Sequence, residues 1–388
     1  MAKLGEICLI NPKSCTLRDD TEVSFIPMTK VGEHGEFDAS EIKNYSEVKK
    51  GFTNFQNGDI LFAKITPCME NGKGAIAHNM KNGIGFGSTE FHVLRPDTDK
   101  ITSEWLYYLT TWKTFRKEAE RNMTGSAGQK RVPKTFLENY VVNLPDIDTQ
   151  KSENKILRKV DDLIFLRKQQ LAKLDELVKV RFVEMFGDFE FNPKEFPVYH
   201  LCELCDVGSS KRIYQEEQSI SGIPFLKVAD LNELIDTGKY SCSTFIPLER
   251  YEQLLHKELT PTENDILITS RGTLGKCYIV QSDDEFYFQD GMISWLSNFS
   301  PKVSSIYISY LFAQPYIQKQ IESLQAGSTV AYLSIAMLKK INVILPPKKL
   351  QDDFAAFVER VDQQKQTVQQ SLEKLELMKK ALMQEYFG

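Results

Sequence analysis

A tandem repeat with a period of about 200 residues is the feature that most constrains how this chain folds. Short blocks of the first half return in the same order in the second half, and their offset drifts by only a few residues. The matched blocks are Gly58–Leu61 with Asn264–Leu267, Ser103–Tyr108 with Ser305–Tyr310, Gly125–Ser126 with Gly327–Ser328, Val142–Pro145 with Val343–Pro346, Val160–Asp161 with Val361–Asp362, and Phe186–Gly187 with Phe387–Gly388. Chance similarity would not preserve this order, so the sequence predicts two copies of one scaffold that differ in their loops.

Each copy begins with a segment of mixed secondary structure. Short apolar runs separated by Gly and Asn clusters are typical of strands and turns. The predicted strands are Val23–Met28, Ile60–Ile65 and Phe91–Leu94 in the first half, and Phe225–Val228, Asp265–Thr269 and Tyr278–Val280 in the second. Helical patterns follow over Ser103–Arg121 and Ser305–Gln325. We therefore predict an α+β globular unit in each copy.

A long helix is predicted at the end of each copy, because apolar residues recur there at alternating steps of three and four. The predicted seam consists of Leu157, Val160, Ile164, Leu171, Leu174, Val178 and Met185 in the first helix, and Val358, Val361, Val368, Leu372, Leu375, Leu382 and Tyr386 in the second. Charged residues interrupt it at Arg167, Arg181, Lys365 and Lys379. A narrow stripe of this length favours a coiled-coil seam, and two such helices in one chain are expected to pair. The alternative is that each helix packs only on its own globular unit.

The repeat and the helices together predict four segments. The globular units occupy residues 1–149 and 188–346, and the long helices occupy residues 150–187 and 347–388.

Composition favours an ordinary soluble protein. The 388 residues include 41% hydrophobic residues and carry a formal net charge of −5. No apolar run has the length of a signal peptide or approaches the roughly 18 to 20 residues of a membrane span, so we expect a cytoplasmic protein. The seven scattered cysteines are typical of reduced thiols. Because the net charge is negative, any contact with nucleic acid must come from local positive charge.

Motifs that resemble active sites fail when their surroundings are considered. Glu153 and Lys155 imitate part of a magnesium-dependent nuclease site, but they lie at the start of a predicted helix rather than on a strand. Pro346–Pro347 lacks the flanking residues of the loop with which adenine methyltransferases grip a base. Cys202 and Cys205 form a single pair with no second pair at zinc spacing. We therefore assign no catalytic residue and no metal ligand.

Two polar, glycine-bearing loops recur in both copies and form the candidate binding surface. One loop follows the strand that begins with Asp-Ile-Leu, and the other follows the helix predicted over Ser103–Arg121 or Ser305–Gln325. In the first half, residues 113–134 include seven basic and two acidic residues. Arginine can bind guanine through two hydrogen bonds, Lys and Thr can contact phosphates or base edges, and Gly lets backbones approach closely. The candidate DNA-binding residues are Lys64, Thr66, Asn71, Lys73, Ser126, Gln129, Lys130 and Arg131 in the first half, and Lys211, Arg212, Ser270, Arg271, Thr273, Lys276, Ser328 and Thr329 in the second.

Over its full length the chain resembles the specificity subunits of type I restriction-modification enzymes. The resemblance rests on the tandem organisation, the Gly-Ser loops, Leu-Pro before each long helix, and the segments Gly58–Pro67, Met69–Lys73 and Asp265–Gly272. It implies that the two globular units are target-recognition domains, each reading one half of a bipartite site in double-stranded DNA. It also implies that the two helices form an antiparallel coiled coil, which spaces the domains like a ruler and docks partner subunits.

The same resemblance implies partners and cofactors. The family has no catalytic residues or cofactors of its own. It docks two adenine-N6 methyltransferase subunits that use S-adenosylmethionine, and in the full complex two ATP-dependent translocating endonuclease subunits, where ATP and Mg²⁺ are expected. Two alternatives remain open from the sequence: a DNA-modifying enzyme in its own right, and a duplicated scaffold that binds proteins.

Overall fold

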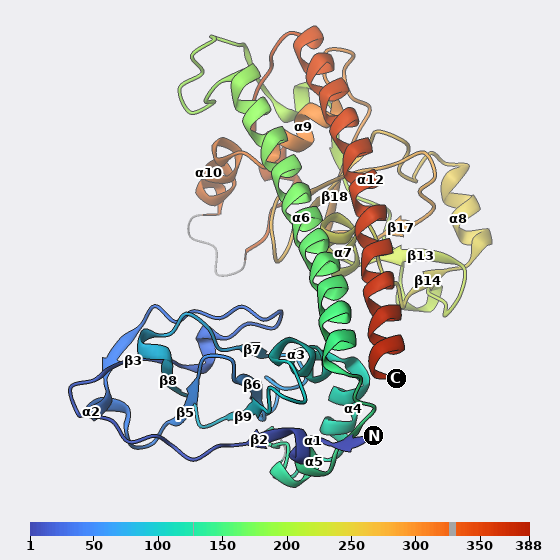
Figure 1. Cartoon of the computed structure of the whole chain (residues 1–388). Coiled ribbons are helices and arrows are strands. Elements are labelled where there is room, and N and C mark those ends of the chain that lie inside the picture. The colour runs from blue at the N-terminus through green and yellow to red at the C-terminus, as the bar shows by residue number, and fades with distance from the viewer. Residues whose placement is uncertain (127, 326–330) are drawn as a thin grey trace. The chain divides into compact units, whose positions relative to one another are not determined.

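The computed structural model describes residues 1–126, 128–325 and 331–388. The chain forms two compact units, the first made of Met1–Gln169 with Gln369–Gly388 and the second of Gln170–Val368. Each unit combines a globular part with a stretch of both long helices, α6 (Ile147–Phe186) and α12 (Lys348–Phe387) (Figure 1). Each compact unit therefore contains part of both long helices, and the linear segment boundaries at 149, 187 and 346 remain predictions.

Two four-stranded sheets form the globular part of the first unit. One sheet has the order β2 (Cys8–Ile10), β9 (Phe91–Pro96), β6 (Ile60–Ala63) and β7 (Gly74–Ile76). The other has the order β4 (Ile42–Asn44), β3 (Glu22–Ile26), β8 (Ile84–Gly87) and β5 (Thr53–Gln56), in which β3 and β8 are parallel. A short pair, β1 (Ala2–Lys3) with β10 (Val141–Val142), joins the two ends of the globular part.

Helices cover the first of these sheets. They are α1 (Leu4–Ile7), α3 (Ser103–Thr111), α4 (Lys113–Arg121) and α5 (Lys134–Asn139), while α2 (Tyr45–Val48) follows β4. Trp105, Leu106 and Phe115 are fully or almost fully buried beneath them, because α3 and α4 turn their apolar faces toward β6. These three side chains therefore belong to the core.

The second unit repeats this plan. Its four-stranded sheet has the order β12 (Asp206–Gly208), β18 (Ile293–Ser297), β15 (Ile266–Thr269) and β16 (Cys277–Ile279). A three-stranded sheet contains β14 (Phe245–Ile246), β13 (Ile223–Leu226) and β17 (Tyr287–Phe288), with β13 and β17 parallel, and the closing pair is β11 (Val198–His200) with β19 (Asn342–Ile344). The helices are α7 (Val228–Thr237), α8 (Leu248–Leu255), α9 (Ser305–Phe312), α10 (Pro315–Leu324) and α11 (Ile335–Leu338). Matching strand order in both halves confirms the duplicated α+β fold.

The helices predicted over Ser103–Arg121 and Ser305–Gln325 are each divided into two helices in the structure. In the second unit, Gln314 is extended (φ −80°, ψ 148°) and Pro315 begins α10. A residue before proline avoids the helical region, and proline is favoured at the first helical position, so the break follows from the sequence. In the first unit, α3 and α4 meet at Trp112, which is also extended (φ −63°, ψ 128°). No proline marks that break.

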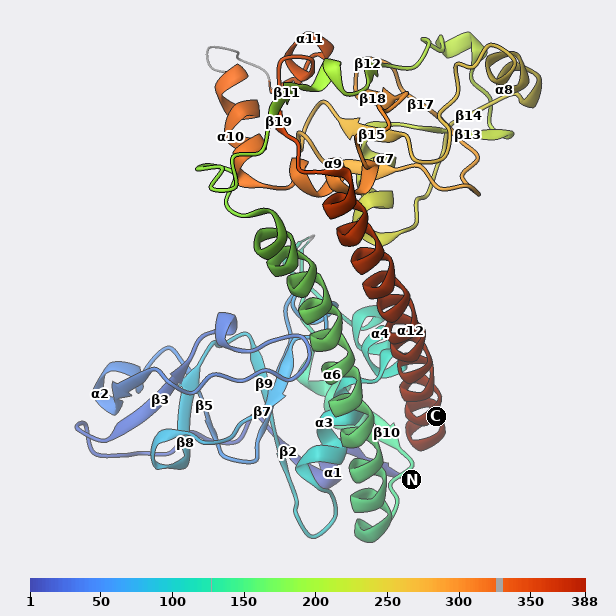
Figure 2. The same ribbon diagram turned by 90° about the horizontal axis from the view of Figure 1, so that it is seen from above.

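The long helices pair, and Figure 2 shows them running side by side. The pairing is antiparallel, because α6 residues late in the helix meet α12 residues early in it. Asp161 binds Lys379 at 2.5 Å within the first unit, and Asp175 binds Lys365 at 2.7 Å within the second. The two lysines that interrupt the apolar stripe of α12 therefore reach carboxylates on α6. The seam residues predicted from the stripe are buried or half-buried.

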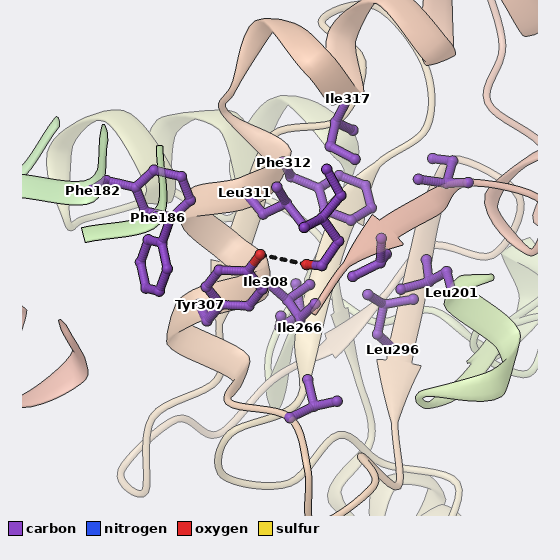
Figure 3. Close-up of a cluster of buried hydrophobic side chains, with 14 of the residues drawn as sticks. Phe182, Phe186, Leu201, Ile266, Leu296, Tyr307, Ile308, Leu311, Phe312 and Ile317 are labelled. Atoms are coloured by element: carbon purple, nitrogen blue, oxygen red, sulfur yellow. Dashed lines mark hydrogen bonds between the residues drawn. The ribbon is translucent and has the colours of Figure 1, made fainter. Parts of the chain in front are cut away.

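Aromatic side chains anchor the helix pair to the core of the second unit. Phe182 and Phe186 of α6 pack against Tyr307 of α9, with ring centroids 5.9 and 5.0 Å apart (Figure 3). Phe354 of α12 lies 5.3 and 5.4 Å from the same two rings. The Tyr307 hydroxyl donates to the carbonyl of Ile344, which satisfies its one polar group in the core.

A buried glutamine ties the start of each long helix to its globular part. Gln150, the fourth residue of α6, accepts from Thr102 N (2.9 Å) and donates to the carbonyls of Lys100 and Pro145 (both 2.9 Å). Gln351 is the fourth residue of α12. It repeats the pattern, accepting from Ser304 N (2.9 Å) and donating to the carbonyls of Lys302 (3.0 Å) and Pro346 (2.7 Å). Both side chains are fully buried with both ends hydrogen-bonded, so they fix how each helix leaves its unit.

Candidate nucleic-acid interface

The two polar loops predicted from the sequence pair with each other in the first unit. Thr66 N donates to the carbonyl of Lys130 (3.0 Å), and Val132 N donates to that of Lys64 (2.9 Å). On its other side, Lys64 N donates to the carbonyl of Glu90, just before β9 (2.9 Å). Three segments that are far apart in sequence therefore meet where β6 ends.

The second unit brings the matching segments together. Leu333 N donates to the carbonyl of Ser270 (2.9 Å), while Ser270 N donates to that of Met292 (2.9 Å). Arg271 and Tyr332 form an isolated β-bridge, as Ile65 and Arg131 do in the first unit. The predicted residues Ser328 and Thr329 lie outside the described residues.

Several candidates in the first unit already have partners. Arg131 donates two hydrogen bonds to the Glu90 carboxylate, from Nε (2.9 Å) and from Nη2 (2.8 Å). These bonds lower the pKa of the Glu90 carboxyl. Lys73 Nζ donates to the carbonyl of Met28 (3.1 Å), and Thr66 Oγ1 donates to Glu70 (2.8 Å). These contacts hold the loops in shape and leave fewer polar groups for a ligand.

The remaining candidates of the first unit are more available. Asn71, Ser126, Gln129 and Lys130 are exposed. Lys64 is half-buried and, within the described part of the chain, neither it nor Lys130 has a carboxylate within 4.0 Å. This edge therefore presents two unpaired cations beside exposed amides, which suits contact with phosphates and base edges.

The second unit distributes its charge differently. Arg271 is exposed, and its Nη1 lies 3.8 Å from the sulfur of Met292, with no carboxylate in ion-pair range among the residues that the structure describes. Lys276 binds Asp236 (2.6 Å), and Arg212 binds Asp290 (2.8 Å). Of the two arginines in this group, Arg271 is therefore the one whose guanidinium is not held by a carboxylate within the described part of the chain.

The other candidates in the second unit fall into two groups. Lys211 and Thr273 are exposed. Ser270 is buried, with its hydroxyl 2.7 Å from that of Ser294, so its side chain supports the loop from inside. Sequence reasoning did not separate these roles, because burial at the end of a strand depends on the sheet beneath it.

Two residues that contact the candidate arginines were not predicted from the sequence. Glu90 pairs with Arg131, and Met292 lies against Arg271 at the matching place in the other unit. Both residues precede a core strand, which is the signal that could have directed attention to them.

No three His, Cys, Asp or Glu residues within the described ranges cluster closely enough to hold a metal ion. None of the described helices has the length and hydropathy to cross a membrane.

This geometry defines a class: a duplicated α+β protein that presents two similar loop edges on units joined through a pair of antiparallel helices. The family model for the type I restriction modification DNA specificity domain matches residues 1–176 and 193–377. The chain therefore belongs to that family.

Relatives and solved structures agree with this assignment. The EcoAI specificity subunit of Escherichia coli is 46% identical over 178 residues, which cover 44% of this chain and 30% of that protein. A putative type I specificity subunit of Haemophilus influenzae, S.HindORF215P, is 23% identical over 84% of this chain and 79% of its own length. A structure described as showing complex assembly and conformational transition of the type I R-M system shares the fold, with a TM-score of 0.61 at 16% identity over 99% of this chain and 96% of that one. The match to EcoAI thus spans less than a third of that relative.

A buried histidine beside the first loop edge generates a pH prediction. His92 Nε2 donates to the carbonyl of Val132 (2.8 Å), so its other ring nitrogen accepts from Asn11 Nδ2 (3.0 Å). Burial lowers the pKa of His92 from its usual value near 6.5, so the unfolded chain takes up this proton at higher pH than the folded chain. The stability that neutral His92 provides is complete above about pH 6.5 and is lost as the pH falls below it.

We expect the thermal midpoint of the wild-type chain to decrease as the pH is lowered from 7 to 5.5. The midpoint of His92→Gln should decrease less over the same pH range. Thermal unfolding followed by circular dichroism measures both. The exposed His256→Gln is the matched control and should keep the wild-type slope. An unchanged slope in His92→Gln would show that other groups cause the pH dependence.

Proposed function

We propose that this chain is the sequence-specific DNA-recognition subunit of a type I restriction-modification assembly. In this proposal each globular unit reads one half of a bipartite site, and partner subunits methylate adenine and restrict foreign DNA. The observation that carries the proposal is the duplication of one loop edge in two units of a chain whose family model matches both halves.

The difference between the two loop edges supports separate half-sites. The first edge combines Lys64 and Lys130 with a constrained Arg131–Glu90 pair, whereas the second presents Arg271 beside a thioether. A free guanidinium can bind the O6 and N7 atoms of guanine through two hydrogen bonds. A guanidinium held by a carboxylate has fewer donors to offer, so similar scaffolds present different chemistry to DNA.

The length of the helices supports the ruler role. Each long helix has 40 residues and so measures about 60 Å at about 1.5 Å per residue. Successive major-groove turns on one face of B-DNA lie roughly 34–36 Å apart. Helices of this length are sufficient to separate two recognition units by at least one turn of DNA, and the number of unread base pairs would follow from them.

Exposed apolar residues on α6 support partner docking. Five of them, Ile156, Leu163, Leu166, Leu177 and Val180, are between 43% and 57% exposed. Their spacing places these five along one side of the helix, next to the seam. We propose that this face binds an adenine-N6 methyltransferase subunit, and that a complete assembly contains two such subunits and two ATP-dependent translocating endonuclease subunits.

The chemistry in this proposal belongs to the partners. S-adenosylmethionine would be bound by the methyltransferase, and ATP and Mg²⁺ by the translocating endonuclease. This chain would contribute sequence recognition and assembly, with no catalytic residue and no cofactor of its own.

A base-resolution map of adenine methylation tests the proposal. DNA from cells that express this chain with its cognate methyltransferase is compared with DNA from cells that express the methyltransferase alone. We expect a new bipartite methylated motif only when this chain is present. If both proteins are soluble and associated but no motif emerges, a protein-binding scaffold becomes the better account.

Arg271→Ala tests the assignment of the second loop edge in the same assay. We expect recognition to relax at one or more positions of a single half-site, with discrimination there falling by about 5- to 150-fold, since a good two-bond contact to a base is worth about 1–3 kcal/mol. The other half-site is the internal control. Equal weakening on all sequences would instead identify Arg271 as a phosphate contact.

A further inference from the structure

A buried arginine, Arg116, lies beneath the first loop edge. Arg116 is the fourth residue of α4, and only 8% of it is exposed. Its Nη1 donates to the carbonyl of Met69 at 2.6 Å, and its guanidinium lies 5.3 Å from the centre of the Phe62 ring. Its Nε and Nη2 are buried with no hydrogen-bond acceptor among the described residues.

Burial of Arg116 in this arrangement lowers the free energy of unfolding, so folding by itself does not explain it. No carboxylate within the described ranges lies in ion-pair range of Arg116, and burial lowers the pKa of its guanidinium to about 10. Burying a charged group without a partner is unfavourable, and an apolar side chain of similar size is often more stable in such a place. The contact to Met69 is therefore the feature that needs an explanation.

Met69 lies at the inner side of the first recognition loop. Its side chain is fully buried, and its carbonyl also accepts from Gly72 N (3.1 Å). The next residues, Glu70 and Asn71, are exposed on the outer side. The carbonyl of Met69 thus connects the core to the turn that carries the exposed polar groups.

Arg116 also reaches the far end of this loop. A Cβ placed on Gly74 would lie 3.7 Å from Nη2, so the guanidinium sits close to the backbone where β7 begins. One rigid, planar group therefore bonds one end of the segment from Met69 to Gly74 and lies near the other. The bond to Met69 restricts the conformations that the next residues, Glu70 and Asn71, can adopt.

The second unit has a neutral residue at the matching place. Gln318 is the fourth residue of α10, as Arg116 is of α4. Its Nε2 donates to the carbonyl of Phe312 (2.7 Å) and would lie 3.2 Å from a Cβ on Gly275. Gln318 approaches its loop but makes its hydrogen bond to a neighbouring helix, so a charged clamp on the loop is a property of the first unit.

We propose that Arg116 is a positioning residue for sequence recognition by the first unit. From the buried side, its guanidinium holds the carbonyl of Met69, and so sets the conformation in which the exposed Asn71 meets DNA. This inference rests on the proposed function and adds a residue that determines specificity without touching DNA.

The test maps adenine methylation for the full chain expressed with its cognate methyltransferase. The variants are Arg116→Lys, which keeps the charge and a hydrogen-bond donor but loses the planar guanidinium, and Arg116→Met, which removes both charge and donors. Lys117→Met, on the exposed side of α4, is the matched control. Thermal unfolding and co-purification with the methyltransferase report folding and assembly of each variant.

We expect Arg116→Met to relax base preference in one half-site by on the order of tenfold, while the other half-site keeps its preference. Arg116→Lys should lie between Arg116→Met and wild type, and Lys117→Met should match wild type. Should Arg116→Met fail to fold, relaxation of one half-site in Arg116→Lys carries the test.

Two results would overturn the inference. One is an unchanged pair of half-sites in a folded Arg116 variant. The other is a uniform loss of methylation with unchanged base preference, which would make Arg116 a purely structural residue. If the wild-type chain produces no bipartite motif, the proposed function itself is wrong. That result comes from the wild-type chain alone, so it is distinguishable from a failure of the Arg116 inference.

Discussion

The antiparallel seam between α6 and α12 is the constraint on which the rest of the structure depends. Asp161 with Lys379 in one unit and Asp175 with Lys365 in the other follow the same register. A charged residue within an apolar seam is less stabilising than leucine, but it specifies which residues face each other. The register in turn fixes which stretch of each helix joins which unit, and Gln150 and Gln351 then fix the direction in which each helix leaves its globular part.

Duplication supplies two copies of a scaffold, and small changes at matched places give each copy its own chemistry. Arg131 is bound by Glu90, whereas Arg271 lies beside Met292. Arg116 clamps one recognition loop, whereas Gln318 turns to its own neighbouring helix. In this account the strands and buried side chains give both units the same scaffold, and the residues at the strand ends determine which DNA half-site each unit recognises.

Sequence patterns predicted the features that repeat along the chain. The α+β duplication and the pairing of the long helices are confirmed by the fold, because strand runs and apolar stripes follow local periodicities. The break at Pro315 had a local signal, whereas the break at Trp112 had none. The two predicted polar loops pair with each other in the first unit, and in the second unit the first loop pairs with Tyr332 and Leu333, which follow the undescribed residues 326–330.

Features that depend on long-range packing could not be predicted. Gln150 reads as a polar helix residue until the carbonyls of Lys100 and Pro145 are placed beside it. Arg116 reads as part of a basic surface, but it is buried because α4 turns that side of the helix toward the sheet. Charge counted along the sequence therefore overstated the cations available to DNA.

The central claim is that the helix pair sets the spacing between two independent readers. Its most direct test is insertion of one heptad into each helix, after Gln169 in α6 and after Gln370 in α12, followed by mapping of the methylated motif. One heptad adds about 10 Å to each helix and keeps the seam in phase. The account predicts a longer unread spacer between two unchanged half-sites. Altered half-sites at the original spacer would contradict it.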